Sequence, residues 1–391
     1  MREAHSSANA AVFVTSHFHS PLARKTDIHF LAEALSRRGW TTNIVTVGQS
    51  LAKQLLRPSI ARLARSVGPA DAQQPVGGYV ARELIHPLSG AAAWLELASA
   101  PLLVSYGRSL DRRLHNLVER ADLVVIEAGY PSLYHAALSR AAPGARFACF
   151  LNDDLAVVGF RRAVVARALA AMPKFHLVRV PAQALLGYLP DGCRAVLIPH
   201  GVEKHLFDQS WRSPYRRGRR NVVSVGNMLF EAEVVRAMAQ HRPDVDFHVI
   251  GAHLADPLPA NIIRHGELAF ERAVPFIKFA DAGLAPYRRH AGASYLADSS
   301  MKLLQYSYCG LPLLLPDHLP TRQRRAFSYA PSDRSSIGRA LDRALGCGGA
   351  PVAAADILDW SEIAERILEE AFYPCNRQRS PRTAPLMQPS T

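Results

Sequence analysis

The sequence has no apolar run of the roughly 20 residues that a membrane-spanning helix requires. The longest candidate, Ala91 to Val104, contains Glu96 and is interrupted by Pro101. The amino-terminal segment MREAHSSANA is polar, and the apolar run AVFVT that follows it is too short for a signal peptide. The sequence therefore predicts a cytoplasmic protein without a membrane span.

Cysteine and acidic residues are both scarce. The five cysteines are scattered and lack the spacing of a metal site, so we interpret them as reduced thiols that mostly fill the core. The 33 Asp and Glu face 46 Lys and Arg, which gives a net charge of +13 and predicts an anionic partner. Nucleic acid is one candidate, but the chain carries no recognisable nucleic-acid-binding motif.

The anionic leaflet of a bacterial membrane is a second candidate partner. In the first half of the chain, basic residues stand beside leucines or follow the apolar segment around Trp94. These residues are Lys53, Arg57, Arg62, Arg65, Arg108, Arg112 and Arg113. The pattern is typical of a protein surface that rests on lipid head groups, and equally of a solvated basic face without a partner.

The length of 391 residues exceeds what one core usually serves, so two domains are expected. Short apolar runs alternate with segments of helical period, which predicts βαβ units and a parallel sheet. A helix is predicted over Asp27–Arg38, capped by Asp27 and ended by Gly39. The strands predicted in the first half are Val12–Thr15, Asn43–Val47, Leu123–Glu127, Arg146–Phe150 and Leu177–Val180.

The pattern restarts after a polar linker, which we place at residues 208–220. We predict one Rossmann-like domain over residues 1–207 and a second over 221–357. A helix in residues 358–373 is expected to pack back on the first domain, before a disordered tail at 374–391. The fold class is α/β, with two Rossmann-like domains facing each other across a cleft and ligands at the carboxyl ends of the strands.

The stretch YLADSSMKLLQYSYCG, from Tyr295 to Gly310, is the most informative in the chain. Asp298, Ser299 and Ser300 stand where a helix would begin, and their oxygens can accept its first backbone N–H groups. Such a helix end carries partial positive charge and binds phosphate, and Lys302 adds a full charge there. The pattern predicts a site for an anionic ligand, although many well-capped helices bind nothing.

Four further segments accompany this helix: LNDD (151–154), GNMLFE (226–231), HGEL (265–268) and APYRRH (285–290). With them the chain resembles the bacterial glucuronosyltransferases that build xanthan-type exopolysaccharides, an inverting family of the two-Rossmann-domain GT-B kind (glycosyltransferase family 70). The resemblance is densest from Asn221 to Pro316 and covers most of the chain except the tail. The run LADSSMKLLQY matches the family pattern nearly letter for letter.

The resemblance implies a donor-binding set in the second half. These residues are Met228, Glu267, Leu268, Tyr287, Ser300, Met301, Lys302 and Gln305. Glu267 follows a strand, as the carboxylates that bind ribose hydroxyls do, although a surface carboxylate is the alternative. At Leu268 the family more often has methionine. Lys302 is expected either to offset charge on the UDP leaving group or to pair with a glucuronate carboxylate.

The same resemblance places the catalytic base at Asp153, because an inverting transfer needs a group that removes the acceptor hydroxyl's proton. Asp154 stands where the family has glycine, so it is an alternative base; we interpret it as the cap of a following helix. Glu127, Arg24 and Lys25 are predicted acceptor contacts, the two cations at an acceptor's diphosphate; a solvated loop is the equally weighted alternative for Arg24 and Lys25. No metal or other cofactor is expected.

The D-x-D triplet Asp244-Val245-Asp246 resembles a metal-binding motif of other glycosyltransferases. It precedes a predicted strand, at the end of the sheet away from ligands, so it is not expected to hold a metal.

The resemblance implies transfer of glucuronic acid from UDP-glucuronate to a mannose-ended, polyprenyl-diphosphate-linked oligosaccharide, at the cytoplasmic face of the bacterial inner membrane. The expected partners are thus a UDP-sugar, a lipid-linked acceptor and an anionic membrane surface, and not nucleic acid. The alternatives are transfer from another UDP-hexose, a nucleotide-sugar epimerase on the same fold, and a non-catalytic subunit of a polysaccharide-assembly complex. The last predicts decay of the base and donor residues, yet Asp153, Lys302 and Gln305 are present.

Overall fold

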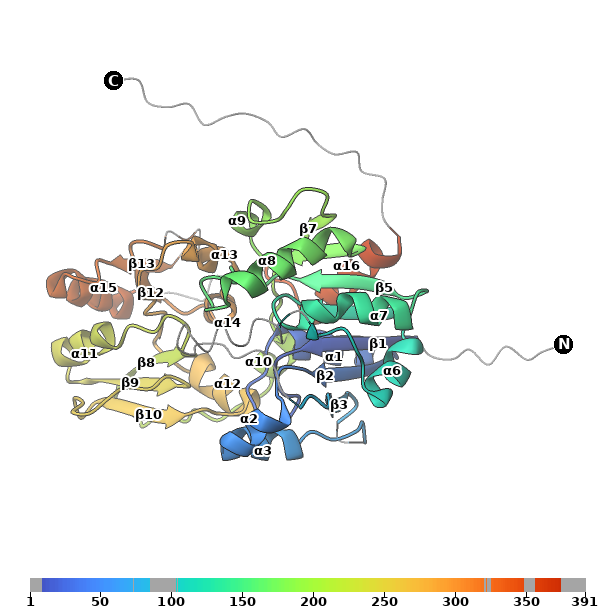
Figure 1. The fold of residues 1–391 in the computed structure, drawn as a ribbon. Coiled ribbons are helices and arrows are strands. Elements are labelled where there is room, and N and C mark those ends of the chain that lie inside the picture. The colour runs from blue at the N-terminus through green and yellow to red at the C-terminus, as the bar shows by residue number, and fades with distance from the viewer. Residues whose placement is uncertain are drawn as a thin grey trace, which may run out of the picture.

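Two parallel sheets form the two lobes of the molecule (Figure 1). The computed structural model describes residues 9–72, 74–84, 103, 105–319, 321, 325–347 and 356–373. The predicted disordered tail and, apart from Leu103, the apolar segment around Trp94 lie outside these residues. Within the described part, the first sheet has the order β3-β2-β1-β4-β5-β6-β7 and the second the order β10-β9-β8-β11-β12-β13. The predicted α/β class is confirmed.

The first sheet contains every strand predicted for this half. Its strands are β1 (Ala10–Thr15), β2 (Thr41–Thr46), β3 (Gly77–Val80), β4 (Leu123–Glu127), β5 (Arg146–Phe150), β6 (Leu177–Val180) and β7 (Ala195–Leu197). The sequence did not predict β3 and β7, which form the two edges. The central strands are buried on both faces, and such strands read as continuous apolar runs.

Helices cover both faces of the first sheet. Phe13 points to one face, where α1 (Asp27–Arg37) and α16 (Trp360–Phe372) pack. Val12 and Val14 point to the other, toward α6 (Arg112–Glu119), α7 (His135–Ala141) and α8 (Arg162–Ala171). Trp360 of α16 is fully buried and stacks on Phe30 of α1, with ring centroids 5.7 Å apart. This contact ties the end of the described chain to the first lobe.

The prediction that Asp27 caps α1 was wrong. The N-cap is Thr26, whose backbone N–H donates to His29 Nδ1 at 3.1 Å in a reciprocal capping arrangement. Asp27 is instead the first residue of the helix, and its buried carboxylate accepts a hydrogen bond from Arg179 Nη1 at 3.4 Å. Gly39, with φ of +85°, follows the helix end as expected.

The second sheet repeats the plan of the first. Its strands are β8 (Arg220–Val225), β9 (Val245–Ile250), β10 (Ile262–Gly266), β11 (Ala282–Leu284), β12 (Leu313–Pro316) and β13 (Ala326–Tyr329). On one face lie α11 (Ala232–His241) and α15 (Arg334–Gly346). On the other lie α12 (Phe270–Lys278) and α14 (Met301–Tyr308), which face the first lobe.

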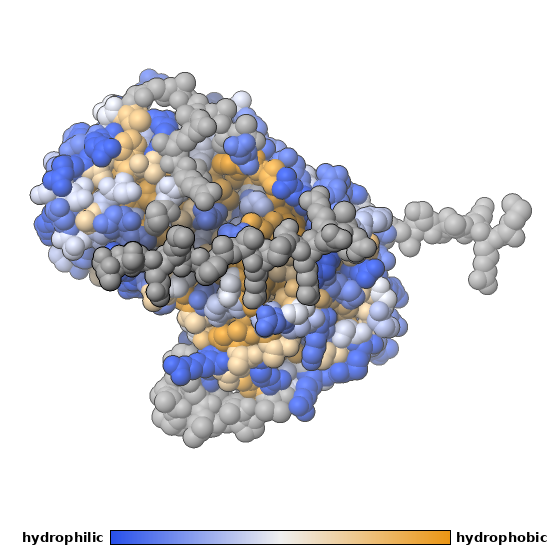
Figure 2. Space-filling view, turned by 90° about the horizontal axis from the view of Figure 1, so that it is seen from above, coloured by the Kyte–Doolittle hydropathy of each residue, from blue (hydrophilic) through white to orange (hydrophobic). Residues whose placement is uncertain are grey.

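Shorter helices complete the described fold. They are α2 (Leu51–Leu56), α3 (Pro58–Arg65), α9 (Gln183–Leu186), α10 (Lys204–Asp208) and α13 (Leu296–Ser299), with 3₁₀ turns η1 (Pro131–Tyr134), η2 (Met172–Lys174) and η3 (Ala293–Tyr295). On the face that Figure 2 shows, apolar residues gather along the middle of the molecule, and hydrophilic residues dominate its outer parts.

The segment predicted as one helix from Asp298 forms two helices. Ser300 has extended backbone angles (φ −66°, ψ 112°) and separates α13 from α14. Its hydroxyl accepts a hydrogen bond from the N–H of Leu303, so Ser300 is the N-cap of α14. The helix that carries Lys302 and Gln305 therefore begins at Met301, three residues after Asp298, with Lys302 in its first turn.

Candidate active site

A cavity of about 620 Å³ lies between the two sheets. Both sheets reverse their strand order beside their first strand, at β1/β4 and at β8/β11, and ligands of such sheets bind beyond the carboxyl ends of the strands there. The first lobe contributes residues that follow β1, β4 and β5, and the second those that follow β8, β9 and β10. The topology thus places the strand-end loops of both lobes around one space.

All twelve residues predicted for the site line this cavity. They are Arg24, Lys25, Glu127, Asp153, Met228, Glu267, Leu268, Tyr287, Ser300, Met301, Lys302 and Gln305. Glu267 is exposed at the end of β10, and Met228 is half-buried after β8. The arrangement brings the predicted donor and acceptor residues together, while the role of each stays a prediction.

Lys302 is the cation of the second lobe in the cavity. Its Nζ lies 4.7 Å from the centroid of the Tyr287 ring, and it forms no ion pair with any described residue. Burial lowers the pKa of Lys302 to about 7, because the ammonium ion loses its hydration there. An anionic ligand would restore its charged form. The cavity therefore contains a buried basic group that has no carboxylate partner among the described residues.

The loop after β8 leaves room beside this lysine. Gly226 has φ of +85°, a conformation that L side chains rarely adopt, and a Cβ added there would lie 3.8 Å from Lys302 Nζ. Tyr287 hydrogen-bonds to Ser300 at 2.7 Å between their hydroxyl oxygens, which ties the segment after β11 to the N-cap of α14. The helix N-terminus, the lysine and the glycine together suit a diphosphate.

Asp153 is the carboxylate that the loop after β5 brings to the cavity. Its Oδ1 accepts a hydrogen bond from the hydroxyl of Tyr295, 3.0 Å away on the second lobe. Burial raises the pKa of Asp153 to about 6, and the hydrogen bond from Tyr295 opposes the shift. The carboxylate is thus ionised at neutral pH and holds a proton more strongly than an ordinary aspartate.

Asp154 has a different environment. Its Oδ1 accepts hydrogen bonds from the N–H groups of Ala156 at 2.8 Å and Val157 at 3.4 Å, and it is not among the residues that line the cavity. The helix predicted directly after Asp154 is wrong, because a turn occupies residues 155–159. Asp154 therefore closes that turn, and the next helix, α8, begins at Arg162.

The sequence analysis did not assign His17 or Asp27 to the site, although both line the cavity, His17 in the loop after β1 and Asp27 at the start of α1. His17 Nε2 lies 3.3 Å from Glu127 Oε1, and Thr15 donates to the other oxygen of Glu127 at 2.6 Å. Burial opposes ionisation of Glu127, but His17 and these hydrogen bonds outweigh it and lower the pKa of Glu127 to about 2. Asp27 also lines the cavity, and burial raises its pKa to about 6. For His17, the position two residues after the end of β1 was the available signal.

The two predicted phosphate-binding cations already have partners. Arg24 Nη1 donates to Asn227 Oδ1 of the second lobe at 3.2 Å. Lys25 Nζ lies 2.9 Å from Glu33 and 2.7 Å from Glu271, whose carboxylates offset its charge. Both side chains therefore link the two lobes in this structure, and their contact with an acceptor diphosphate stays a prediction.

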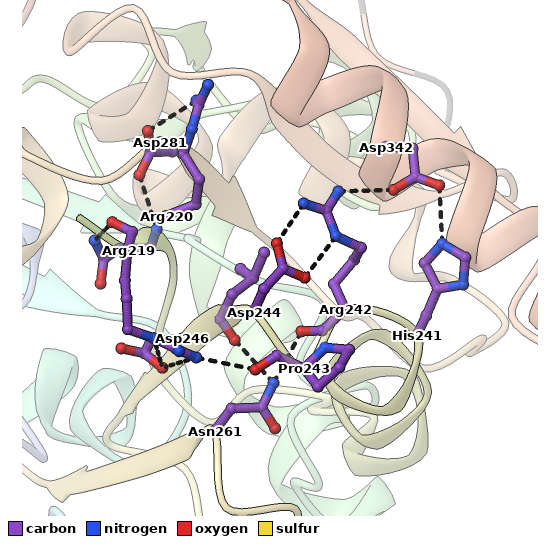
Figure 3. A network of polar contacts seen from close by, with 12 residues as sticks. Arg219, Arg220, His241, Arg242, Pro243, Asp244, Asp246, Asn261, Asp281 and Asp342 are labelled. Atoms are coloured by element: carbon purple, nitrogen blue, oxygen red, sulfur yellow. Dashed lines mark hydrogen bonds and ion pairs between the residues drawn. The ribbon is translucent and has the colours of Figure 1, made fainter.

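The D-x-D triplet lies at the amino end of β9, whose other end leads to Gly251 in the cavity. Asp244 pairs with Arg242 at 2.7 Å and Asp246 with Arg219 at 2.8 Å (Figure 3). Arg242 also contacts Asp342 of α15. Each carboxylate of the triplet thus has an arginine partner, the exposed Asp244 in Arg242 and the buried Asp246 in Arg219.

Solved structures share this two-lobed architecture. They include the N-terminal domain of Candida albicans trehalose-6-phosphate phosphatase (TM-score 0.55, 11% identity, 92% of this chain and 94% of that one). AviGT4, a glycosyltransferase involved in avilamycin A biosynthesis, has a TM-score of 0.51 at 14% identity, over 93% and 97% of the two chains. A UDP-forming trehalose-phosphate synthase from Burkholderia xenovorans gives 0.51 at 14%, over 93% and 96%. These likenesses show the fold, which is that of the GT-B class with two Rossmann-like domains.

Two sequence comparisons show which known proteins this chain is similar to. Residues 13–181 match the N-terminal domain of the glucuronosyltransferase GumK. The UDP-glucuronate:glycolipid 2-beta-glucuronosyltransferase of Xanthomonas campestris pv. campestris is 28% identical over 357 residues, which cover 90% of this chain and 88% of that protein. The chain is therefore a relative of the GumK-type glucuronosyltransferases, and the resemblance that its motifs indicated is confirmed.

Proposed function

We propose that this protein transfers glucuronic acid from UDP-glucuronate to a mannose-ended, polyprenyl-diphosphate-linked oligosaccharide, with inversion, as a step of exopolysaccharide synthesis. The observation that carries the proposal is the cavity between the lobes, where Asp153 of one lobe and Lys302 of the other line the same space. The specificity of the Xanthomonas relative supports the choice of donor and of a glycolipid acceptor.

In this mechanism Asp153 takes the proton of the acceptor hydroxyl as that oxygen attacks the anomeric carbon and the bond from the sugar to UDP breaks. The raised pKa of Asp153 suits a base that must be ionised before the reaction and protonated after it. Lys302 and the N-terminus of α14 offset the charge that develops on the departing UDP. We propose that these groups perform this role without a metal ion.

The test is sugar transfer to a mannose-ended lipid-linked acceptor, with UDP-glucuronate and UDP-glucose in parallel. Asp153→Asn is expected to lose about 10²- to 10⁴-fold in rate. Asp154→Asn is the matched control, since asparagine keeps an oxygen for the turn and the side chain lies outside the cavity lining. Transfer from UDP-glucose but not from UDP-glucuronate would rule out glucuronate as the sugar transferred. Full activity of Asp153→Asn would refute the assignment of Asp153 as the base.

We also propose that the first lobe rests on an anionic membrane surface, which would bring the lipid-linked acceptor to the cavity. Among the described residues, no helix is long and apolar enough to cross a bilayer. Exposed leucines stand beside basic residues on and around α2 and α3: Leu51, Leu55, Leu56 and Leu84 beside Lys53, Arg57, Arg62 and Arg65. Leu55 and Leu56 are 85% and 81% exposed, which is costly in water and favourable in a lipid interface.

Sedimentation with vesicles tests this surface. Wild type should bind vesicles that contain anionic lipid, and ionic strength should release part of it because salt screens the basic residues. The double variant Leu55→Ser and Leu56→Ser should bind more weakly at every salt concentration, because it lacks the apolar contact. If the variant binds as strongly as wild type, the apolar part of the proposal is wrong. If salt does not change binding of wild type, the electrostatic part is wrong.

A further inference from the structure

The proposed base is held by a residue of the opposite lobe. Asp153 belongs to the loop after β5 of the first sheet, whereas Tyr295 belongs to η3 between β11 and α13 of the second lobe. The Tyr295 hydroxyl donates to Asp153 Oδ1 at 3.0 Å, and the tyrosine is 1% exposed. A buried hydrogen bond therefore crosses from one lobe to the other at the group that would take the proton.

The backbone before Tyr295 is shaped for this contact. Gly292 has φ of +84°, and a Cβ added there would lie 3.0 Å from Asp154 Oδ2. A side chain at this position would be strained and would press on the neighbour of the base. On its other side, the carbonyl oxygen of Tyr295 accepts a hydrogen bond from the Ser299 hydroxyl at 3.0 Å. Tyr295 is thus joined to the segment that leads directly into α14 and Lys302.

The chemistry of the pair fixes the direction of the hydrogen bond. Burial and the adjacent Asp153 carboxylate raise the pKa of Tyr295, so the phenol stays protonated and donates. Oδ1 of Asp153 is occupied by this bond, while Oδ2 accepts no hydrogen bond from any described residue. One oxygen is held by the second lobe, and the other is available to an acceptor hydroxyl in the cavity.

We propose that Tyr295 is a positioning residue of the transfer reaction: it fixes Asp153 through Oδ1, directs Oδ2 to the acceptor hydroxyl, and couples the base to the lobe that holds the donor. The inference rests on the proposed function of Asp153. Because the bond spans the cleft, any opening of the lobes breaks it, so the base is correctly held only when the donor lobe is in place.

The pH dependence follows from the groups around Asp153. Burial, Asp27 and Glu127 raise its pKa, while the hydrogen bond from Tyr295 and the charge on His17 lower it. Tyr287, the other phenol near Asp153, is kept protonated by burial, which raises its pKa. Removal of the Tyr295 hydroxyl takes away a contact that favours the ionised base. The acid limb of activity should then move to higher pH.

The experiment compares pH profiles of kcat/KM and kcat for wild type, Tyr295→Phe, Tyr308→Phe and Asp153→Asn with UDP-glucuronate as donor. Tyr308→Phe is the matched control, since its hydroxyl donates to Asp208 at 2.8 Å outside the cavity lining. In Tyr295→Phe the acid limb should move up by about one pH unit, because loss of a hydrogen bond to a charged carboxylate raises its pKa by about that much. Its plateau kcat should fall about tenfold, with the KM for the donor little changed.

The profile of Tyr308→Phe should match that of wild type. Gly292→Ala provides a second variant, which keeps the tyrosine but strains its loop, and it should shift the acid limb in the same direction. Thermal unfolding of each variant separates these effects from loss of folded protein. The inference is overturned if Asp153→Asn is inactive while Tyr295→Phe keeps the limb and plateau of wild type. Full activity of Asp153→Asn would instead remove the proposed base, and the inference with it.

Discussion

Binding of the donor should be accompanied by uptake of a proton at Lys302, because this buried lysine has no carboxylate partner among the residues that the structure describes. Burial holds its pKa at about 7. A diphosphate or a carboxylate beside the ammonium group should return that pKa to its ordinary range or above, since an opposite charge favours the charged form. At about pH 8 roughly a tenth of Lys302 is protonated before binding and nearly all of it after, so uptake is about 0.9 proton per donor bound.

The same equilibrium sets the pH dependence of affinity. If only the protonated form binds well, the competent fraction falls from about one half at pH 7 to about one tenth at pH 8, and affinity falls about fivefold. Neither the diphosphate nor the uronate of UDP-glucuronate titrates in this range. Lys302→Met should bind more weakly than wild type and without this pH dependence.

The assay is calorimetry in two buffers of equal pH and different ionisation enthalpy, from which the number of protons taken up follows directly. UDP-glucose as a second ligand separates the two roles open to Lys302. Uptake with both ligands indicates contact with the diphosphate, and uptake with UDP-glucuronate alone indicates contact with the uronate. Absence of proton uptake by wild type, or equal uptake by Lys302→Met, would refute the reasoning.

Two further predictions concern the donor loop and the core. Gly226→Ala and Gly218→Ala each force a side chain onto a positive φ, which costs about 1 kcal/mol of folding stability. Only Gly226→Ala should also weaken binding of UDP-glucuronate in titrations, because its methyl group enters the space beside Lys302. Trp360→Ala should lower the free energy of unfolding by about 3–5 kcal/mol in denaturant titrations. The exposed control Tyr373→Ala should change it by less than about 0.5 kcal/mol.

The sequence predicted the central strands well because they are buried on both faces. Strands β4, β5 and β6 have the predicted ends, since their apolar runs stop where the chain leaves the sheet. The two edge strands were missed for physical reasons. β3 reads GGYV, and its glycines resemble a turn. β7 has three residues, of which Ala195 and Leu197 are exposed, so its sequence carries no core signal.

The site residues that directly follow strands could be predicted from the sequence, because ligands of parallel sheets bind beyond the carboxyl ends of the strands. Glu127, Asp153 and Glu267 each follow a strand, and parallel sheets bring such positions to one edge. Tyr295 was not predictable in this way. Its partner Asp153 lies 142 residues earlier, and the contact depends on the turn at Gly292 and on how the lobes face each other. No periodic pattern in the sequence indicates that Tyr295 and Asp153 are in contact.

The environments of the carboxylates separate their roles. Glu127 is a much weaker base than Asp153, since His17 and its hydrogen bonds lower the pKa of Glu127 whereas burial raises that of Asp153. Such a weak base suits a fixed anion beside His17. Asp27 matches Asp153 in basicity, but its Oδ2 accepts from the buried Arg179. Asp154 is committed to two backbone N–H groups. Of these four carboxylates, Asp153 combines a raised pKa with the absence of an ion pair to any described residue, whereas Asp27 is paired with Arg179; these properties suit a general base.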